Sequence, residues 1–128
     1  MRLNQVTIPL VDYDASVAFY RTLGLKLIVD APPRYARFEV PEGGSTFSIE
    51  KVEGWTGGDW PEVWFESDRL DELVAELKAK GIVFESEPED MSYLWRVAHL
   101  RDPAGNRITL YHAGENRLNP PWRVNSST

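Results

Sequence analysis

The residues best suited to chemistry in this sequence are two carboxylates, an amide and several hydroxyl and aromatic side chains that alternate with apolar neighbours. Oxygen donors of these kinds can hold a hard or borderline divalent cation. A carboxylate kept in a pocket could instead act as a general base. The positions on the polar side of this alternation are Gln5, Thr7, Ser48, Glu50, Glu62, Trp64, Thr109 and Tyr111.

Other chemistries have less support in the residue content. The chain has no Cys, which excludes disulfides, thiolate metal sites and Cys nucleophiles. Its two histidines lack a second His at a metal-ligand spacing, so we interpret His99 as a packed structural residue and His112 as a partly exposed strand end. The adjacent Trp95 and Arg96 suit a planar or anionic ligand, although a strand with one side exposed explains the pair equally well.

The composition is typical of a small protein that binds neither nucleic acid nor membranes. The 128 residues carry a formal net charge of -6, and such an acidic balance repels both a phosphate backbone and an anionic membrane surface. The N-terminus lacks the apolar core of a secretory signal and no apolar run reaches the ~20 residues of a membrane span, so we expect a cytoplasmic location. The aromatic content is compatible with an aromatic-lined pocket, although ordinary filling of core and interface is the commoner explanation.

The elements that must position these residues begin with a helix. Residues 67–80 carry four apolar side chains at positions i, i+3, i+4 and i+7, which predicts one buried stripe. Ser67 or Asp68 can serve as the N-cap, and Gly81 follows as a left-handed stop.

A second copy of this device lies roughly 56 residues earlier in the chain. Residues 12–23 form the expected helix, with Asp14 as the N-cap candidate and Gly24 as its stop. Alternation and turn residues predict one strand before each helix and three after it. These strands are expected at residues 4–10, 26–30, 35–40, 45–52, 62–66, 82–85, 94–101 and 106–112, with a hairpin turn at 102–105.

The order β-α-β-β-β therefore occurs twice, which predicts an α+β fold with one mixed sheet per module. We expect module 1 at residues 1–53, a linker at 54–61, module 2 at 62–113 and a C-terminal tail at 114–128. One helix can cover only one face of each sheet, so the other faces are expected to enclose a core or a cleft. If the apolar residues of each strand pack on the helix, the polar and aromatic residues between them line that cleft.

Two stretches of the chain carry a family resemblance. The first is NQVTIPLVDYDASVAFYRTLGLKL, with its S-x-x-F-Y helix and L-G-L, and the second is LRDPAGNRITLYHAGE, with its D-P-x-G-N turn. They resemble the opening and the closing motifs of the vicinal oxygen chelate superfamily of glyoxalases, bleomycin resistance proteins and extradiol dioxygenases. The likeness spans roughly residues 3–113 and implies paired βαβββ modules in a U-shaped sheet around a cleft, often in a homodimer.

The resemblance also implies a divalent-metal site with ligands from the first and last strand of each module. In this chain those positions are Gln5, Glu50, Glu62 and Thr109, and Thr109 stands where a glutamate is usual. The ions to expect are Zn, Ni, Mn, Mg or Fe.

Two functions follow as alternatives, with a degenerate site as the remaining possibility. The first is a metal-assisted lyase or isomerase that acts on a small oxygenated substrate, with Glu50 or Glu62 as the base where it is not a ligand. The second is a metal-free protein that binds or sequesters an antibiotic-like small molecule. Its cleft would use Trp64, Trp95, Arg96 and Tyr111 to stack and hold a planar ligand. Thr7 and Ser48 complete the expected substrate-binding residues.

Overall fold

The computed structural model describes residues 3–55 and 61–124, in which the chain divides into two compact units. The first unit comprises Met1–Glu62 with Arg101–Arg107, and the second comprises Val63–Leu100 with Ile108–Thr128. Most of the predicted linker, residues 56–60, lies outside the described residues, as does the end of the predicted tail.

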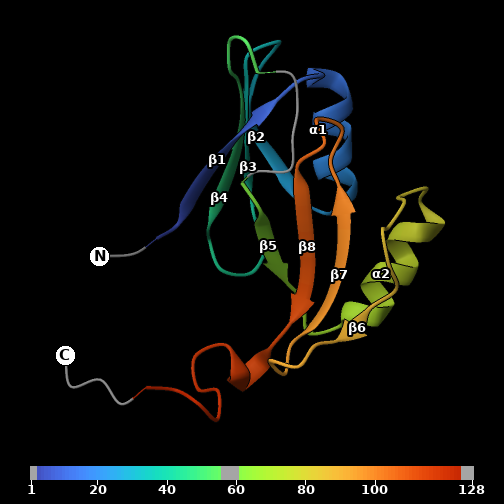
Figure 1. Cartoon of the computed structure of the whole chain (residues 1–128). Coiled ribbons are helices and arrows are strands. Elements are labelled where there is room, and N and C mark those ends of the chain that lie inside the picture. The colour runs from blue at the N-terminus through green and yellow to red at the C-terminus, as the bar shows by residue number, and fades with distance from the viewer. Residues whose placement is uncertain (1–2, 56–60, 125–128) are drawn as a thin grey trace. The chain divides into compact units, whose positions relative to one another are not determined.

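Each unit contains one helix and a four-stranded sheet, in the order that the repeat predicts (Figure 1). The first unit contains β1 (Gln5–Leu10), α1 (Tyr13–Thr22), β2 (Lys26–Ala31), β3 (Tyr35–Glu39) and β4 (Thr46–Lys51). The second contains β5 (Val63–Glu66), α2 (Leu70–Ala79), β6 (Glu89–Asp90), β7 (Arg96–Arg101), β8 (Arg107–His112) and a 3-10 turn, η1 (Gly114–Asn116). The two βαβββ copies confirm the predicted α+β fold class.

Both sheets are mixed and share one topology. The strand order is β1-β4-β3-β2 in the first sheet and β5-β8-β7-β6 in the second. The strand that opens each copy runs parallel to the strand that closes it, whereas β3 is antiparallel to both of its neighbours and β6 is antiparallel to β7. The strand before each helix therefore lies at one edge of its sheet.

The N-cap of α1 lies two residues earlier than the predicted one. Asp12 is the N-cap, because its extended backbone lets its carboxylate accept a hydrogen bond from the Ala15 N–H at 3.0 Å. The predicted cap, Asp14, lies instead in the first turn, where its charge suits the helix dipole. Gly24 ends the helix with a φ of +104°, as predicted.

The α2 helix is shorter than predicted at its start. It begins at Leu70 after Arg69, which occupies the N-cap position without a side-chain cap, while Ser67 Oγ accepts a hydrogen bond from the Arg69 N–H at 3.1 Å. At the other end, Gly81 takes the predicted left-handed conformation, with a φ of +93°.

The core of the first unit lies between α1 and one face of its sheet. Tyr20 of α1 packs on Phe38 and Phe47, with ring centroids 5.8 and 4.7 Å away. Ile8 and Ile49 lie on the same side of neighbouring strands and are almost fully buried. The apolar alternation thus faces α1, as predicted, and the polar alternation occupies the other face.

The second unit is built in the same way. Arg96 on β7 donates a hydrogen bond to Asp71 on α2 at 2.8 Å, so the even-numbered side of β7 faces the helix. Ala98 and Leu100 share that side and are fully buried. The odd-numbered residues of β7 therefore point to the opposite face of the sheet, as the alternation predicts.

One predicted strand is wrong. Residues 82–85 form no strand but make a single bridge, from Phe84 to Leu100, and one hydrogen bond from the Glu85 N–H to the His99 carbonyl. The ladder with β7 is formed instead by the two residues of β6. Pro88 lies between the two contacts and has no N–H to donate, which explains why the pairing is interrupted there.

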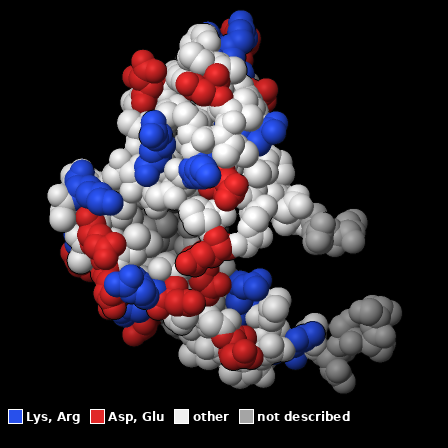
Figure 2. Space-filling view, turned by 180° about the vertical axis from the view of Figure 1, so that it is seen from behind, with Lys and Arg blue, Asp and Glu red and all other residues white. Residues whose placement is uncertain are grey.

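Basic side chains on the face seen in Figure 2 lie singly or in small groups among acidic ones, in keeping with the net charge of -6. Among residues 3–55 and 61–124, no helix has the length and apolar character needed to cross a membrane.

Candidate functional site

A ladder of polar side chains covers the face of the first sheet that is turned away from α1. The Gln5 amide nitrogen donates to Ser48 Oγ at 2.9 Å and to Thr7 Oγ1 at 3.1 Å, while the Gln5 amide oxygen accepts a hydrogen bond from Thr46. The Tyr35 hydroxyl shares a hydrogen bond of 2.7 Å with Ser48. The structure therefore brings three predicted positions together, but their polar atoms are bonded to one another.

Besides Thr46, two members of this polar face, Tyr35 and Arg37, were not among the predicted site residues. Arg37 Nε donates to the Tyr35 hydroxyl at 2.8 Å, and the guanidinium carbon lies 5.5 Å from the Tyr35 ring centroid. The signal for both was present in the sequence, because Tyr35 and Arg37 alternate with Ala36 and Phe38, which are fully buried.

The two candidate catalytic carboxylates are exposed in the structure. Glu50 lies near the end of β4, on the same side as Thr46 and Ser48, but it is level with Pro9 whereas Gln5 is level with Thr46. Four strand positions separate these levels, a distance of about 13 Å along the strand. Glu62 directly precedes β5 and is also exposed.

Four aromatic rings and one imidazole gather on the face of the second sheet that is turned away from α2. We call this cluster the aromatic face, and its members are Trp64, Tyr93, Trp95, His99 and Tyr111. Trp95 and Tyr111 are stacked, with centroids 4.8 Å apart and an interplanar angle of 20°. Trp64 meets Trp95, Tyr111 and His99 edge-on at 5.7, 5.5 and 6.2 Å. Tyr93 meets Trp95 in the same way at 5.8 Å.

The side chains of the aromatic face differ in how much of each is exposed to solvent. Trp64 and Tyr93 are 36% and 37% exposed, whereas Tyr111 is only 8% exposed. Because Tyr93 and His99 were not among the predicted site residues, the observed cluster is larger than the predicted one. The Y-x-W alternation of residues 93–95 was the available signal for Tyr93.

Thr109 lies beneath this face and not on its surface. Its hydroxyl shares a hydrogen bond of 2.8 Å with His99 Nδ1, and Trp64 is its register partner on β5. Large side chains thus flank it on both neighbouring strands, and Thr109 has no exposed surface. The hydroxyl serves to satisfy the imidazole, in agreement with the interpretation of His99 as a packed structural residue.

Arg96 is separated from its sequence neighbour Trp95 because consecutive strand residues point to opposite faces. On the α2 side, Arg96 donates to Asp71 at 2.8 Å and to Asp90 at 3.0 Å. The hydrogen bond between Arg96 and Asp71 raises the pKa of Arg96 and lowers the pKa of Asp71. Arg96 borders two open depressions of ≈ 250 and ≈ 290 Å³ along α2, so its guanidinium does not form part of the aromatic face.

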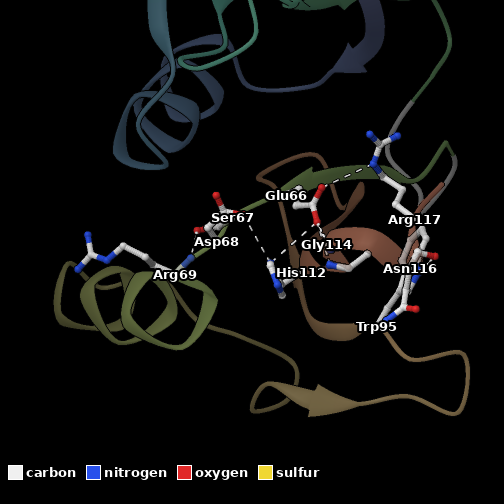
Figure 3. A network of polar contacts seen from close by, with 10 residues as sticks. Glu66, Ser67, Asp68, Arg69, Trp95, His112, Gly114, Asn116 and Arg117 are labelled. Atoms are coloured by element: carbon white, nitrogen blue, oxygen red, sulfur yellow. Dashed lines mark hydrogen bonds and ion pairs between the residues drawn. The ribbon is translucent and has the colours of Figure 1, made fainter. Parts of the chain in front are cut away.

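Glu66, at the end of β5, lies next to Tyr111 of the aromatic face. Burial and the negative charge of Glu66 raise the pKa of Tyr111, while Arg117 acts in the opposite direction. Glu66 accepts hydrogen bonds from the backbone N–H groups of Ala113 and Gly114 at 2.8 and 3.0 Å (Figure 3). This carboxylate was not predicted as a site residue, although the alternation of residues 62–66 places it on the same side of β5 as Trp64.

The donor set does not fit the four-ligand metal site implied by the resemblance. The Gln5 oxygen is bonded to Thr46, Glu50 lies four strand positions away from it, and the Thr109 hydroxyl is neutral and bonded to His99. Within residues 3–55 and 61–124, no three His, Asp or Glu side chains converge in a group suited to a metal ion.

Comparisons with known proteins place this fold. The family model of the Glyoxalase/Bleomycin resistance protein/Dioxygenase superfamily matches residues 2–110. A glyoxalase/bleomycin resistance protein/dioxygenase from Nocardioides has a TM-score of 0.78 at 23% identity, covering 98% of this chain and 90% of that one. A lactoylglutathione lyase from Agrobacterium tumefaciens has a TM-score of 0.73 at 21% identity, covering 87% of this chain and 92% of that one.

A bleomycin-binding protein complexed with bleomycin also has a similar structure. Its TM-score is 0.70 at 22% identity, and the alignment covers 88% of this chain and 98% of that one. No curated protein matches the sequence. At these sequence identities, the likeness to the solved structures shows only that the fold is shared. The family model, in contrast, matches most of the chain and shows the family. The chain therefore belongs to the glyoxalase/bleomycin resistance protein/dioxygenase superfamily.

Proposed function

We propose that this protein binds a planar small molecule on the aromatic face of its second unit, without a metal ion. The observation that carries the proposal is Trp64, which is 36% exposed although it makes T-shaped contacts with three other rings. A large ring that is held in place and yet open to solvent offers a flat apolar surface for stacking.

The aromatic face is also pre-organised, which lowers the entropy cost of binding. Leu94, between Tyr93 and Trp95, has a φ of +68°, an unfavourable conformation for a residue with a branched side chain. This backbone directs both neighbouring rings to one cluster. Strained positions of this kind concentrate at ligand sites, which supports a binding role for the loop between β6 and β7.

The charge balance favours a cationic ligand. Arg96, the residue expected to attract an anion, pairs with Asp71 and Asp90 on the other face of the sheet. The net charge of -6 attracts cations over longer range, and a Trp face is the best aromatic partner for a cation. A planar cation is therefore the ligand class that we expect.

The fold is compatible with binding and with catalysis, since similar structures include a bleomycin-binding protein and a lactoylglutathione lyase. The alternative is thus a metal-assisted lyase or isomerase with Glu50 or Glu62 as ligand or base. The position of Glu50, exposed on the same sheet face as Gln5, is the observation in its favour.

The test is a fluorescence titration with proflavine, a planar cation, alongside bleomycin and the planar anion 2-naphthalenesulfonate. We expect saturable binding of proflavine that weakens at least about tenfold in Trp64→Ala, because a stacking partner is lost. Trp122→Ala is the matched control, since Trp122 is 56% exposed but lies in the C-terminal segment outside the aromatic face.

Equal affinities in wild type and Trp64→Ala would contradict the proposal. Preference for 2-naphthalenesulfonate over proflavine would contradict the cationic ligand class. Binding that requires a divalent ion and disappears in Glu50→Ala would favour the metal-assisted enzyme instead.

A further inference from the structure

The segment that follows β8 is tied back to the end of β5 by one carboxylate. Glu66 Oε2 accepts the N–H groups of Ala113 at 2.8 Å and Gly114 at 3.0 Å, and Glu66 Oε1 lies 3.7 Å from Arg117 Nε (Figure 3). The Glu66 side chain is 28% exposed, so water competes only partly for these contacts. Hydrogen bonds to an ionised acceptor are also stronger than neutral ones.

The same segment reaches the aromatic face at its other end. The Asn116 carbonyl, at the end of η1, accepts a hydrogen bond from the Trp95 indole N–H at 3.2 Å (Figure 3). The η1 turn has three residues and no side-chain cap. Its own backbone hydrogen bonds run from the Asn116 N–H to the Ala113 carbonyl at 3.0 Å and from the Arg117 N–H to the Gly114 carbonyl at 3.2 Å, so contacts from outside add to its stability. Glu66 supplies such a contact at the start of η1. At the end of η1, the Asn116 carbonyl orients Trp95.

We propose that Glu66 is a positioning residue for ligand binding: by holding the backbone at Ala113 and Gly114, it fixes the Asn116 carbonyl that orients Trp95. The inference rests on the proposed function, because it assigns Glu66 a role at the same aromatic face. Glu66 itself acts through Trp95 and touches no ligand.

Two further observations agree with this arrangement. The charge of Glu66 contributes to the raised pKa of Tyr111, the residue on which Trp95 stacks. The His112 ring, whose Nδ1 lies 4.0 Å from Glu66 Oε2 and 3.7 Å from Asp68 Oδ1, would be the nearest neighbour of a side chain added at Gly114. The His112 ring therefore lies beside both Glu66 and the start of η1.

The first experiment measures Trp95 without any ligand. In ¹⁵N-labelled protein, the Trp95 indole N–H signal is assigned with Trp95→Phe. In Glu66→Ala we expect this proton to exchange faster with water and the pKa of Tyr111 to fall. Glu66→Gln keeps an acceptor oxygen for the two N–H groups, so it should restore slow exchange while still lowering the Tyr111 pKa.

The matched control is Asp68→Asn, which removes a neighbouring carboxylate that makes no contact with η1. It should leave the Trp95 signal unchanged. An unchanged Trp95 signal in Glu66→Ala would overturn the inference, and so would an equal change in Asp68→Asn.

The second experiment is a double-mutant cycle read by proflavine affinity. We expect Glu66→Ala to weaken binding about three- to tenfold in the wild-type background and to have no further effect in Trp95→Phe. Additive effects of the two substitutions would overturn the inference, because Glu66 would then act by a route other than Trp95.

The two proposals fail in distinguishable ways. If proflavine, bleomycin and 2-naphthalenesulfonate all fail to bind the wild type, the proposed function is overturned and the ligand role of Glu66 with it. If a probe binds through Trp64 but Glu66→Ala leaves both its affinity and the Trp95 signal unchanged, only the positioning role is overturned.

Discussion

Asp102 is the centre of a buried polar cluster that gives the D-P-x-G-N turn its structural role. Its carboxylate accepts hydrogen bonds from the Tyr20 hydroxyl at 2.6 Å, from the N–H groups of Ala104 and Asn106 at 2.9 and 2.8 Å, and from the Asn106 amide at 3.0 Å. All of these residues belong to the first unit. The amide of Asn106 also donates to the Pro9 carbonyl at 3.0 Å, so the turn is anchored to the end of β1.

This cluster predicts an alkaline limit to stability. Burial and the charge of Asp102 raise the pKa of Tyr20 well above its ordinary value of 10.0. A pKa raised in the folded state means that the stabilisation is fully present below pH 10.0 and is lost as pH rises toward the folded-state pKa. Tyr20→Phe should lower the free energy of unfolding at neutral pH by about 1.5–3 kcal/mol, because a hydrogen bond to a buried carboxylate is lost.

The measurement is urea denaturation of both proteins at neutral pH and at about pH 11. Tyr20→Phe should show a smaller loss of stability between the two conditions than the wild type. Tyr13→Phe is the comparison, because burial and the hydrogen bond to Asp30 raise the pKa of Tyr13 to about 12 by an independent contact. If the wild type and Tyr20→Phe lost the same free energy of unfolding between neutral pH and about pH 11, Tyr20 would not be the group that limits alkaline stability.

At the scale of elements, the start of α1 is set by a single hydrogen bond that two nearby acids could each have made. Asp12 rather than Asp14 has the backbone conformation that brings a carboxylate to the Ala15 N–H. Periodicity placed α1 correctly, but it left its cap uncertain by two residues. The choice depends on where the chain leaves β1, which is a property of the sheet.

A matched pair of variants tests this cap. Asp12→Ala should lower the free energy of unfolding by about 1 kcal/mol, because a capping hydrogen bond is removed. Asp14→Ala removes the same charge but only a favourable helix-dipole interaction, so it should cost a few tenths of a kcal/mol. Both values come from urea denaturation at neutral pH, and equal losses would show that charge alone, without the cap, stabilises the helix start.

The strands show where local pattern stops being sufficient. Seven of the eight predicted strands correspond to β1–β5, β7 and β8, with small differences at their ends. The exception is residues 82–85, whose apolar character is typical of a strand but which pair with β7 only at Phe84 and Glu85. A strand needs a partner along its length, and Pro88 interrupts that partnership.

At the scale of the whole molecule, the donor set predicts that the protein does not depend on a divalent ion. The Gln5 oxygen and the Thr109 hydroxyl already have hydrogen-bond partners inside their own sheets. We therefore expect EDTA treatment to change neither the melting temperature nor the affinity for proflavine.

Metal analysis of protein purified without chelators completes this test, with Glu50→Ala as the comparison. A stoichiometric divalent ion in the wild type that is missing from Glu50→Ala would contradict the proposal that the protein works without a metal ion. A melting temperature that falls with EDTA in the wild type and not in Glu50→Ala would do the same.

The sequence by itself determined the α+β class, the two βαβββ copies, the superfamily and the side of each sheet on which the polar and aromatic residues lie. The superfamily follows from the two motif stretches, whereas the other properties follow from periods of two and 3.6 residues and from turn residues, all of which are local. Only the tertiary structure decided what those side chains are free to do. Thr109 is buried against His99, Gln5 is bonded across β4, and Arg96 is turned toward α2, because each contact joins strands or a helix that are distant in the sequence and depends on register.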